Sequence, residues 1–115
     1  MQLPKSIKLG HFDIKIKELE PELAASNNEE GSFHCNTRTI YIDKDIVDKG
    51  GADLICCLIH ELFHASYYKN NLNHHSSEED LVNSFSNDIT ELLSRTELLK
   101  IINNELRGKN GRPKK

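Results

Sequence analysis

The sequence predicts an α+β fold, because its first third has the two-residue period of strands and the remainder has the period of helices. The strands come first and the helices follow, rather than alternating with them, which is typical of α+β proteins. With 115 residues, 37% of them hydrophobic, the chain suits a single small domain. We expect that domain to span residues 1–108 and residues 109–115 to form a basic, disordered tail.

Two β-hairpins are expected in the N-terminal third. Residues 7–9 and 12–17 alternate apolar and polar side chains on either side of a glycine. Residues 32–35 and 39–43 form the second expected hairpin, and the β-branched and aromatic content of 39–43 makes it the best-supported strand. Between the hairpins, residues 21–28 fit either a short helix or a loop.

Three helices are expected in the remainder of the chain, at about residues 51–69, 78–93 and 96–107. Residues 52–65 are apolar nearly all round the first helix, which predicts that this helix is buried. The second helix carries a one-sided apolar stripe at helical spacing.

The charge distribution separates the domain from its tail. Residues 107–115 carry five basic residues and no acid, which leaves 10 basic against 18 acidic residues, a net charge of −8, elsewhere. An acidic body argues against a nucleic-acid groove on the domain, so only the tail favours that partner. The chain shows no apolar signal segment and no stretch of about 20 apolar residues, so we expect a cytoplasmic protein without membrane attachment.

The three cysteines are odd in number and poorly spaced for a disulfide framework. Cys56 and Cys57 lie one turn before a histidine, so a cysteine-containing metal site is one interpretation. Their simpler interpretation, together with Cys35, is as small core residues.

The segment from His60 to His64 reads H-E-x-x-H within the first expected helix. Residues four apart lie on one face of a helix, so His60 and His64 can offer two imidazole nitrogens to one zinc ion. Glu61 is displaced by about 100° around the helix, which places it beside the metal as a general base for a zinc-bound water. The alternative is a pair of core histidines satisfied by hydrogen bonds.

A catalytic zinc site needs three protein ligands and an open position for water, so a third ligand is required after His64. The metzincin position, six residues on, is occupied by Asn70, which excludes that class. Glu79, Glu78, or a histidine in the loop before them can complete the site; the loop histidines are His74 and His75.

Glu79 is the favoured glutamate because Asn83 lies at i+4, on the same helical face, where it can orient a ligating histidine. Glu78 has Val82 at that position, which cannot do so. The alternative role for Glu79 is structural, because Ser76 to Glu79 spells the S-x-x-E of a capping box.

These residues resemble the gluzincins, in which H-E-x-x-H is joined by a glutamate from a downstream helix with Asp or Asn four residues later. More closely, residues 30–100 look like the small phage and bacterial metallopeptidase domains of the ImmA/IrrE type. The resemblance implies a zincin-like fold, one Zn²⁺ ion and hydrolysis of a protein or peptide substrate, in phage-related regulation. It also implies that strand 39–43 lies at the edge of the cleft, where an extended peptide can add as a further strand; the residues concerned are Thr39, Ile40, Tyr41 and Ile42.

Such a mechanism needs a partner for the developing oxyanion. Tyr67 and Tyr68, one turn after His64, and His34 in the second hairpin are the candidates, although such tyrosines usually only pack. A catalytically weak or latent metal-binding domain that acts through protein–protein interaction is the alternative function. Glu61 favours the enzyme, because a purely structural site needs no base beside its metal.

Overall fold

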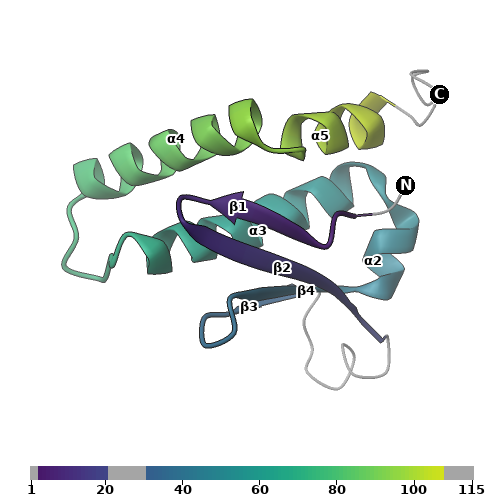
Figure 1. The fold of residues 1–115 in the computed structure, drawn as a ribbon, viewed down its shortest axis with the longest axis horizontal. Coiled ribbons are helices and arrows are strands. Elements are labelled where there is room, and N and C mark those ends of the chain that lie inside the picture. The colour runs from purple at the N-terminus through teal and green to yellow at the C-terminus, as the bar shows by residue number, and fades with distance from the viewer. Residues whose placement is uncertain (1–2, 21–30, 108–115) are drawn as a thin grey trace.

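The computed structural model describes residues 3–20 and 31–107, and four strands there form one mixed sheet (Figure 1). The order across the sheet is β1-β2-β4-β3, with β1 antiparallel to β2, β2 parallel to β4, and β4 antiparallel to β3. Both expected hairpins are therefore present. The strands are β1 (Ser6–Leu9), β2 (Phe12–Leu19), β3 (Gly31–His34) and β4 (Thr39–Asp43).

The expectation that strand 39–43 lies at the sheet edge is wrong. β4 pairs with β2 on one side and with β3 on the other, so both of its edges are hydrogen-bonded. Thr39, Ile40 and Ile42 are at most 2% exposed. β4 is internal because it pairs in parallel with β2, a segment distant in the sequence, so the composition of residues 39–43 does not determine their place in the sheet. Within the described ranges, β3 is the outer strand on this side.

Four helices follow the sheet, and the three long ones match their predicted bounds to within two residues. The short α2 was not expected; its N-terminus is capped by the Asp43 carboxylate, which accepts from the Asp45 amide at 3.1 Å. The helices are α2 (Lys44–Lys49), α3 (Gly51–Lys69), α4 (Glu78–Arg95) and α5 (Leu98–Arg107).

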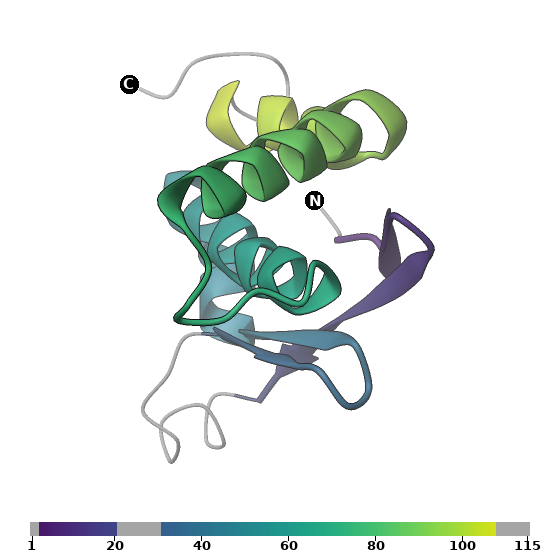
Figure 2. The same cartoon turned by 90° about the vertical axis from the view of Figure 1, so that its left-hand side faces the viewer.

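The elements form three layers, with α3 packed between the sheet and the α4–α5 pair (Figure 2). Leu54, Leu58, Leu62 and Ala65 form a stripe along α3, and each is at most 1% exposed. This stripe joins the inward isoleucines and leucines of the sheet in one core cluster. Burying a leucine side chain contributes about 1.5–3 kcal/mol to stability. The buried stripe of α3 is therefore a large part of what holds the layers together.

The prediction that α3 is buried all round is wrong, because the helix sits at the boundary of the core rather than at its centre. His60, His64 and Cys56 are exposed, on the part of the surface that the sheet and α4 leave open. Cys56 is therefore not the core residue expected, whereas Cys57 is partly buried and packs against the core. Cys35 is exposed, and no disulfide joins any of the three.

The N-terminus of α4 has a capping box one residue later than expected. The Ser77 hydroxyl accepts from the Asp80 amide at 3.1 Å, and the Asp80 carboxylate accepts from the Ser77 amide at 3.2 Å. The structural alternative for Glu79, a capping box with Ser76, is therefore wrong. Because Asp80 satisfies the helix end, the cap makes no use of the Glu79 carboxylate.

A buried carboxylate on α4 ties that helix to the C-terminal turns of α3. Asp88, 5% exposed, accepts from the Ser66 hydroxyl at 2.6 Å, the Asn70 amide group at 2.9 Å and the Lys69 ammonium at 3.1 Å. Low exposure strengthens these bonds and makes an unpaired member costly. The cluster therefore fixes where α4 crosses α3, one turn beyond His64.

Replacing Asp88 with alanine is expected to lower the free energy of unfolding by about 3 kcal/mol, because it leaves the Lys69 charge and two donors without their acceptor. Chemical denaturation followed by circular dichroism measures the change. Asp13→Ala is the matched control: it removes a carboxylate from the exposed ion pair with Lys8, which should cost at most about 1 kcal/mol. Equal losses in the two variants would contradict the role given to the buried cluster.

Two earlier expectations fall on residues outside the described part of the chain: the short helix or loop at 21–28 and the basic tail at 109–115. Of the helices that the structure describes, none has the length and apolar character needed to cross a lipid bilayer.

Candidate metal and hydrolytic site

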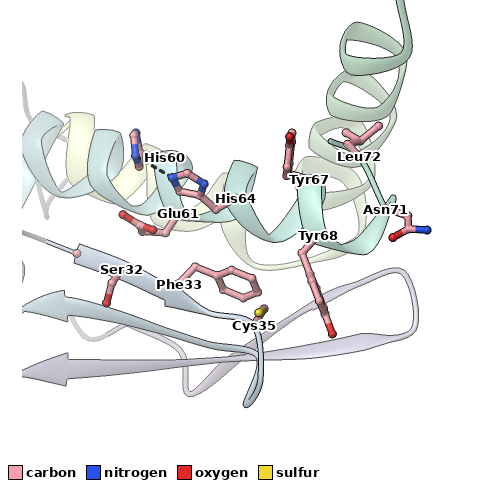
Figure 3. A pocket seen from close by; sticks show the side chains of 11 residues that line it. Ser32, Phe33, Cys35, His60, Glu61, His64, Tyr67, Tyr68, Asn71 and Leu72 are labelled. Carbon is pink, nitrogen blue, oxygen red and sulfur yellow. Dashed lines mark hydrogen bonds between the residues drawn. The ribbon is translucent and has the colours of Figure 1, made fainter. Parts of the chain in front are cut away.

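His60 and His64 present their imidazoles side by side on the exposed face of α3 (Figure 3). Their Nε2 atoms are 3.2 Å apart and their ring centroids are 4.9 Å apart. Two neutral imidazoles can share one proton across this distance only if one has its Nε2 atom unprotonated. A metal ion bound by both rings would replace this hydrogen bond, because it needs the lone pair of each Nε2 atom.

The spacing of the two nitrogens fits a single zinc ion. With Zn–N bonds of about 2.0–2.1 Å and a tetrahedral angle, two ligating nitrogens lie about 3.3–3.4 Å apart. The Nε2 atoms of His60 and His64 match that distance to within about 0.2 Å. The pair is therefore suited to be two of the ligands of one ion.

Glu61 lies beside the pair and turns its carboxylate toward β3 (Figure 3). It is 5% exposed, in contrast to the two histidines. A Cβ atom added to Gly31 would lie 3.4 Å from Glu61 Oε2 and 2.8 Å from Cys57 Sγ, so the glycine allows β3 to approach the carboxylate closely. The strand and the helix thus hold Glu61 in a narrow space next to the histidines.

A hollow of about 550 Å³ opens in front of these side chains, which we call the β3-side hollow. It runs between α3 and the outer strand and reaches the loop that follows α3. Ser32 and Phe33 lie nearest the motif, Tyr67 and Tyr68 follow along α3, and Asn71 and Leu72 lie at the far end (Figure 3). The lining residues are Gly31, Ser32, Phe33, Cys35, His60, Glu61, His64, Tyr67, Tyr68, Asn71 and Leu72.

The three candidates for an oxyanion partner are placed differently. Tyr67 lines the hollow and is 36% exposed, one turn after His64. Tyr68 also lines it, but its ring packs between those of Phe12 and Phe33, at centroid distances of 5.8 and 6.0 Å. His34 is not in the lining: its Nε2 atom lies 3.2 Å from Ser32 Oγ. The structure therefore brings both tyrosines to the hollow and leaves His34 outside it.

The structure does not bring a third metal ligand to the pair. Glu79 and Asn83 share a helical face as predicted, but that face is exposed, and Glu78 is exposed beside it. His74 and His75 lie in the loop with their rings 3.9 Å apart. In residues 3–20 and 31–107, no three His, Cys, Asp or Glu side chains are grouped as a metal site. The third ligand stays a prediction.

Several residues of the site were not predicted from the sequence. Gly31 was not assigned to any element, Phe33 was seen only as part of a strand, and Cys57 was interpreted as a core residue or a metal-site cysteine. Phe63 was treated as a variable position of the motif, yet it stacks on Phe85 of α4, with centroids 4.9 Å apart and planes at 4°. Phenylalanines in two successive helices are by themselves a weak indication of a functional site, because such pairs usually belong to a core.

Comparisons of the chain with protein-family models, with curated proteins and with solved structures found no match.

Proposed function

We propose that this chain is a small zinc metallopeptidase of the gluzincin type, with a zincin-like domain, that cleaves peptide bonds in a protein or peptide substrate. One observation carries the proposal: the Nε2 atoms of His60 and His64 converge to 3.2 Å, and the sheltered carboxylate of Glu61 lies beside them in the same hollow. A structural metal site has no use for such a neighbouring base.

The metal would be held by His60 and His64, with Glu79 as the third ligand we predict. Zinc bound there would supply Lewis-acid chemistry and lower the pKa of a bound water toward neutral pH. Glu61 accepts a proton from the attacking water and passes it to the leaving amine. Tyr67, which lines the hollow one turn after His64, is the residue we propose to donate a hydrogen bond to a carbonyl oxygen that gains negative charge.

The substrate strand is reassigned from β4 to β3, because both edges of β4 are already paired. β3 forms one wall of the β3-side hollow, opposite the motif. An extended peptide that adds to this strand would gain main-chain hydrogen bonds and pass in front of Glu61. The glycine at position 31 lets the strand backbone lie close to the Glu61 carboxylate, where a Cβ atom would clash with Cys57 Sγ at 2.8 Å.

One specific observation favours a second function: a metal-binding domain without hydrolysis that acts through a protein partner. Glu79 lies on an exposed face of α4, and the described residues show no completed ligand set. Two histidines alone would hold zinc weakly and leave the water poorly activated. The two functions make opposite predictions for hydrolysis.

The test is cleavage of a diverse peptide library by the wild-type protein in three states: zinc-loaded, stripped with a chelator, and reloaded with zinc. The peptidase proposal predicts the same set of products in the first and third states and none in the second. Mass spectrometry of the products gives the cleaved bonds. Zinc binding without any cleavage in the loaded state would favour the non-hydrolytic domain.

A further inference from the structure

A second hollow, of about 350 Å³, opens on the other side of the histidine pair, toward α4. We call it the α4-side hollow. It shares His60, His64 and Tyr67 with the β3-side hollow, so the two meet at the histidines. Glu61 lines only the β3-side hollow. A peptide bond held at the histidines therefore has space for substrate groups on two sides.

The walls of the α4-side hollow are aromatic. Apart from the residues it shares with the β3-side hollow, it is lined by Phe63 of α3 and Phe85 of α4. Their rings are parallel to within 4° and 4.9 Å apart, and both residues are half-buried, so part of each ring faces the hollow. No acidic, lysine or arginine side chain is part of the lining.

We propose that the α4-side hollow is a subsite for an aromatic or large aliphatic side chain of the substrate, next to the bond that is cleaved. Phe85 is its specificity-determining residue. The inference rests on the proposed peptidase function and names the class of substrate. A bulky apolar group gains the free energy of leaving water, and an aromatic ring gains a further edge or offset contact with the stacked pair. A charged side chain would lose its hydration without gaining a partner.

The hollow is large enough for one bulky side chain. Its volume lies at the lower end of the range of about 300–1,000 Å³ found for ligand pockets. The two phenylalanines come from different helices, and the Asp88 cluster on the same turns of α4 fixes the crossing of those helices. The subsite is therefore held by the fold rather than by a loop.

The experiment measures binding rather than turnover. Zinc is added to the Glu61→Gln protein, and fluorescence polarisation gives the affinity for a positional-scanning set of labelled octapeptides that carry Phe, Leu, Ala, Asp or Lys at each position in turn. At one position, Phe and Leu should bind about 10–100-fold more tightly than Ala, and Asp and Lys no better than Ala. Adding Phe85→Ala should bring the Phe-to-Ala ratio close to one.

Two further variants control for loss of structure. Phe85→Leu keeps an apolar side chain, so it should retain the preference for Leu while reducing that for Phe. Phe33→Ala changes only the β3-side hollow, so it should weaken all peptides alike and leave the Phe-to-Ala ratio unchanged. Circular dichroism checks that each variant is folded.

The inference is overturned if Asp peptides bind the parent protein as well as Phe peptides, or if a folded Phe85→Ala protein keeps the full ratio. Failure of the peptidase proposal gives a different result. A preference for Phe in binding, with no cleavage by the zinc-loaded wild type, supports the subsite and contradicts the hydrolytic function. Cleavage by the zinc-loaded wild type without any apolar preference supports the hydrolytic function and contradicts the subsite.

Discussion

Replacing Glu61 with glutamine is expected to reduce peptide hydrolysis by at least about 100-fold while the protein stays folded and keeps its zinc. The amide has nearly the same shape as the carboxylate, so the narrow space between α3 and β3 still holds it. It cannot accept a proton from water at neutral pH, and general-base catalysis typically contributes about 100–10,000-fold to a rate. Glu61 is not a proposed ligand, so metal content should not change.

The measurement is kcat/KM for a peptide identified in the library, together with zinc content by mass spectrometry. Glu97→Gln is the matched control, because Glu97 is an exposed carboxylate next to α5 and outside both hollows. It should behave as the wild type. If Glu61→Gln cleaves the peptide at the wild-type rate, Glu61 is not the base. If the variant loses zinc, Glu61 has a ligand role that we have not assigned.

Replacing Glu79 with alanine is expected to weaken zinc binding by orders of magnitude, because a predicted ligand is lost and two histidines remain. Glu78→Ala is the neighbouring control: it removes one acidic side chain from the first turn of α4, worth about 0.3–1 kcal/mol of stability, without touching the metal. Asn83→Ala should fall between them, at about 10–100-fold in affinity, if its amide orients a ligating histidine. Zinc titration with a competing chelator measures all three.

The observed cap separates the effect of the Glu79 substitution on zinc affinity from any effect on the helix end. Because Ser77 and Asp80 close the capping box, the Glu79 and Glu78 variants both leave the end of α4 intact. Asp80→Ala then measures the cap by itself, with a loss of about 1 kcal/mol of stability and no effect on zinc affinity. Zinc affinity in Glu79→Ala equal to that of the wild type would exclude Glu79 as a ligand and return attention to His74 and His75.

Local chemistry predicted the elements of this protein better than their arrangement. The bounds of α3 follow from its long apolar segment between the glycine pair at 50–51 and Asn70, and these signals lie within the segment itself. The convergence of His60 and His64 follows from the period of a helix, which needs no tertiary information. Both parts were therefore accessible from the sequence.

The order of the strands depends on contacts far apart in the chain, which periodicity does not contain. β4 was expected at the edge, yet its parallel pairing with β2 encloses it and makes β3 the outer strand. The link between Asp88 and Ser66 is of the same kind: an aspartate on a helix usually points to water, and only the crossing of α4 over α3 buries this one.

The exposure of α3 was also predicted wrongly, because that prediction used composition alone. An apolar helix was expected to be covered on every side, but two layers cover only two faces of α3 and leave His60 and His64 open. That openness is what a site for metal and substrate needs, because a catalytic ion must keep one position accessible.

The most direct test of the central claim, that one zinc ion is held by His60 and His64, is zinc stoichiometry measured on the wild type and on the His60→Ala/His64→Ala double variant. Native mass spectrometry and a thermal melt with added zinc are sufficient, with His11→Ala as a matched control from the β1–β2 turn. The account predicts one zinc per chain in the wild type and in the control, and a melting temperature that rises with zinc. In the double variant both should be lost. Full zinc occupancy in the double variant would contradict the assignment.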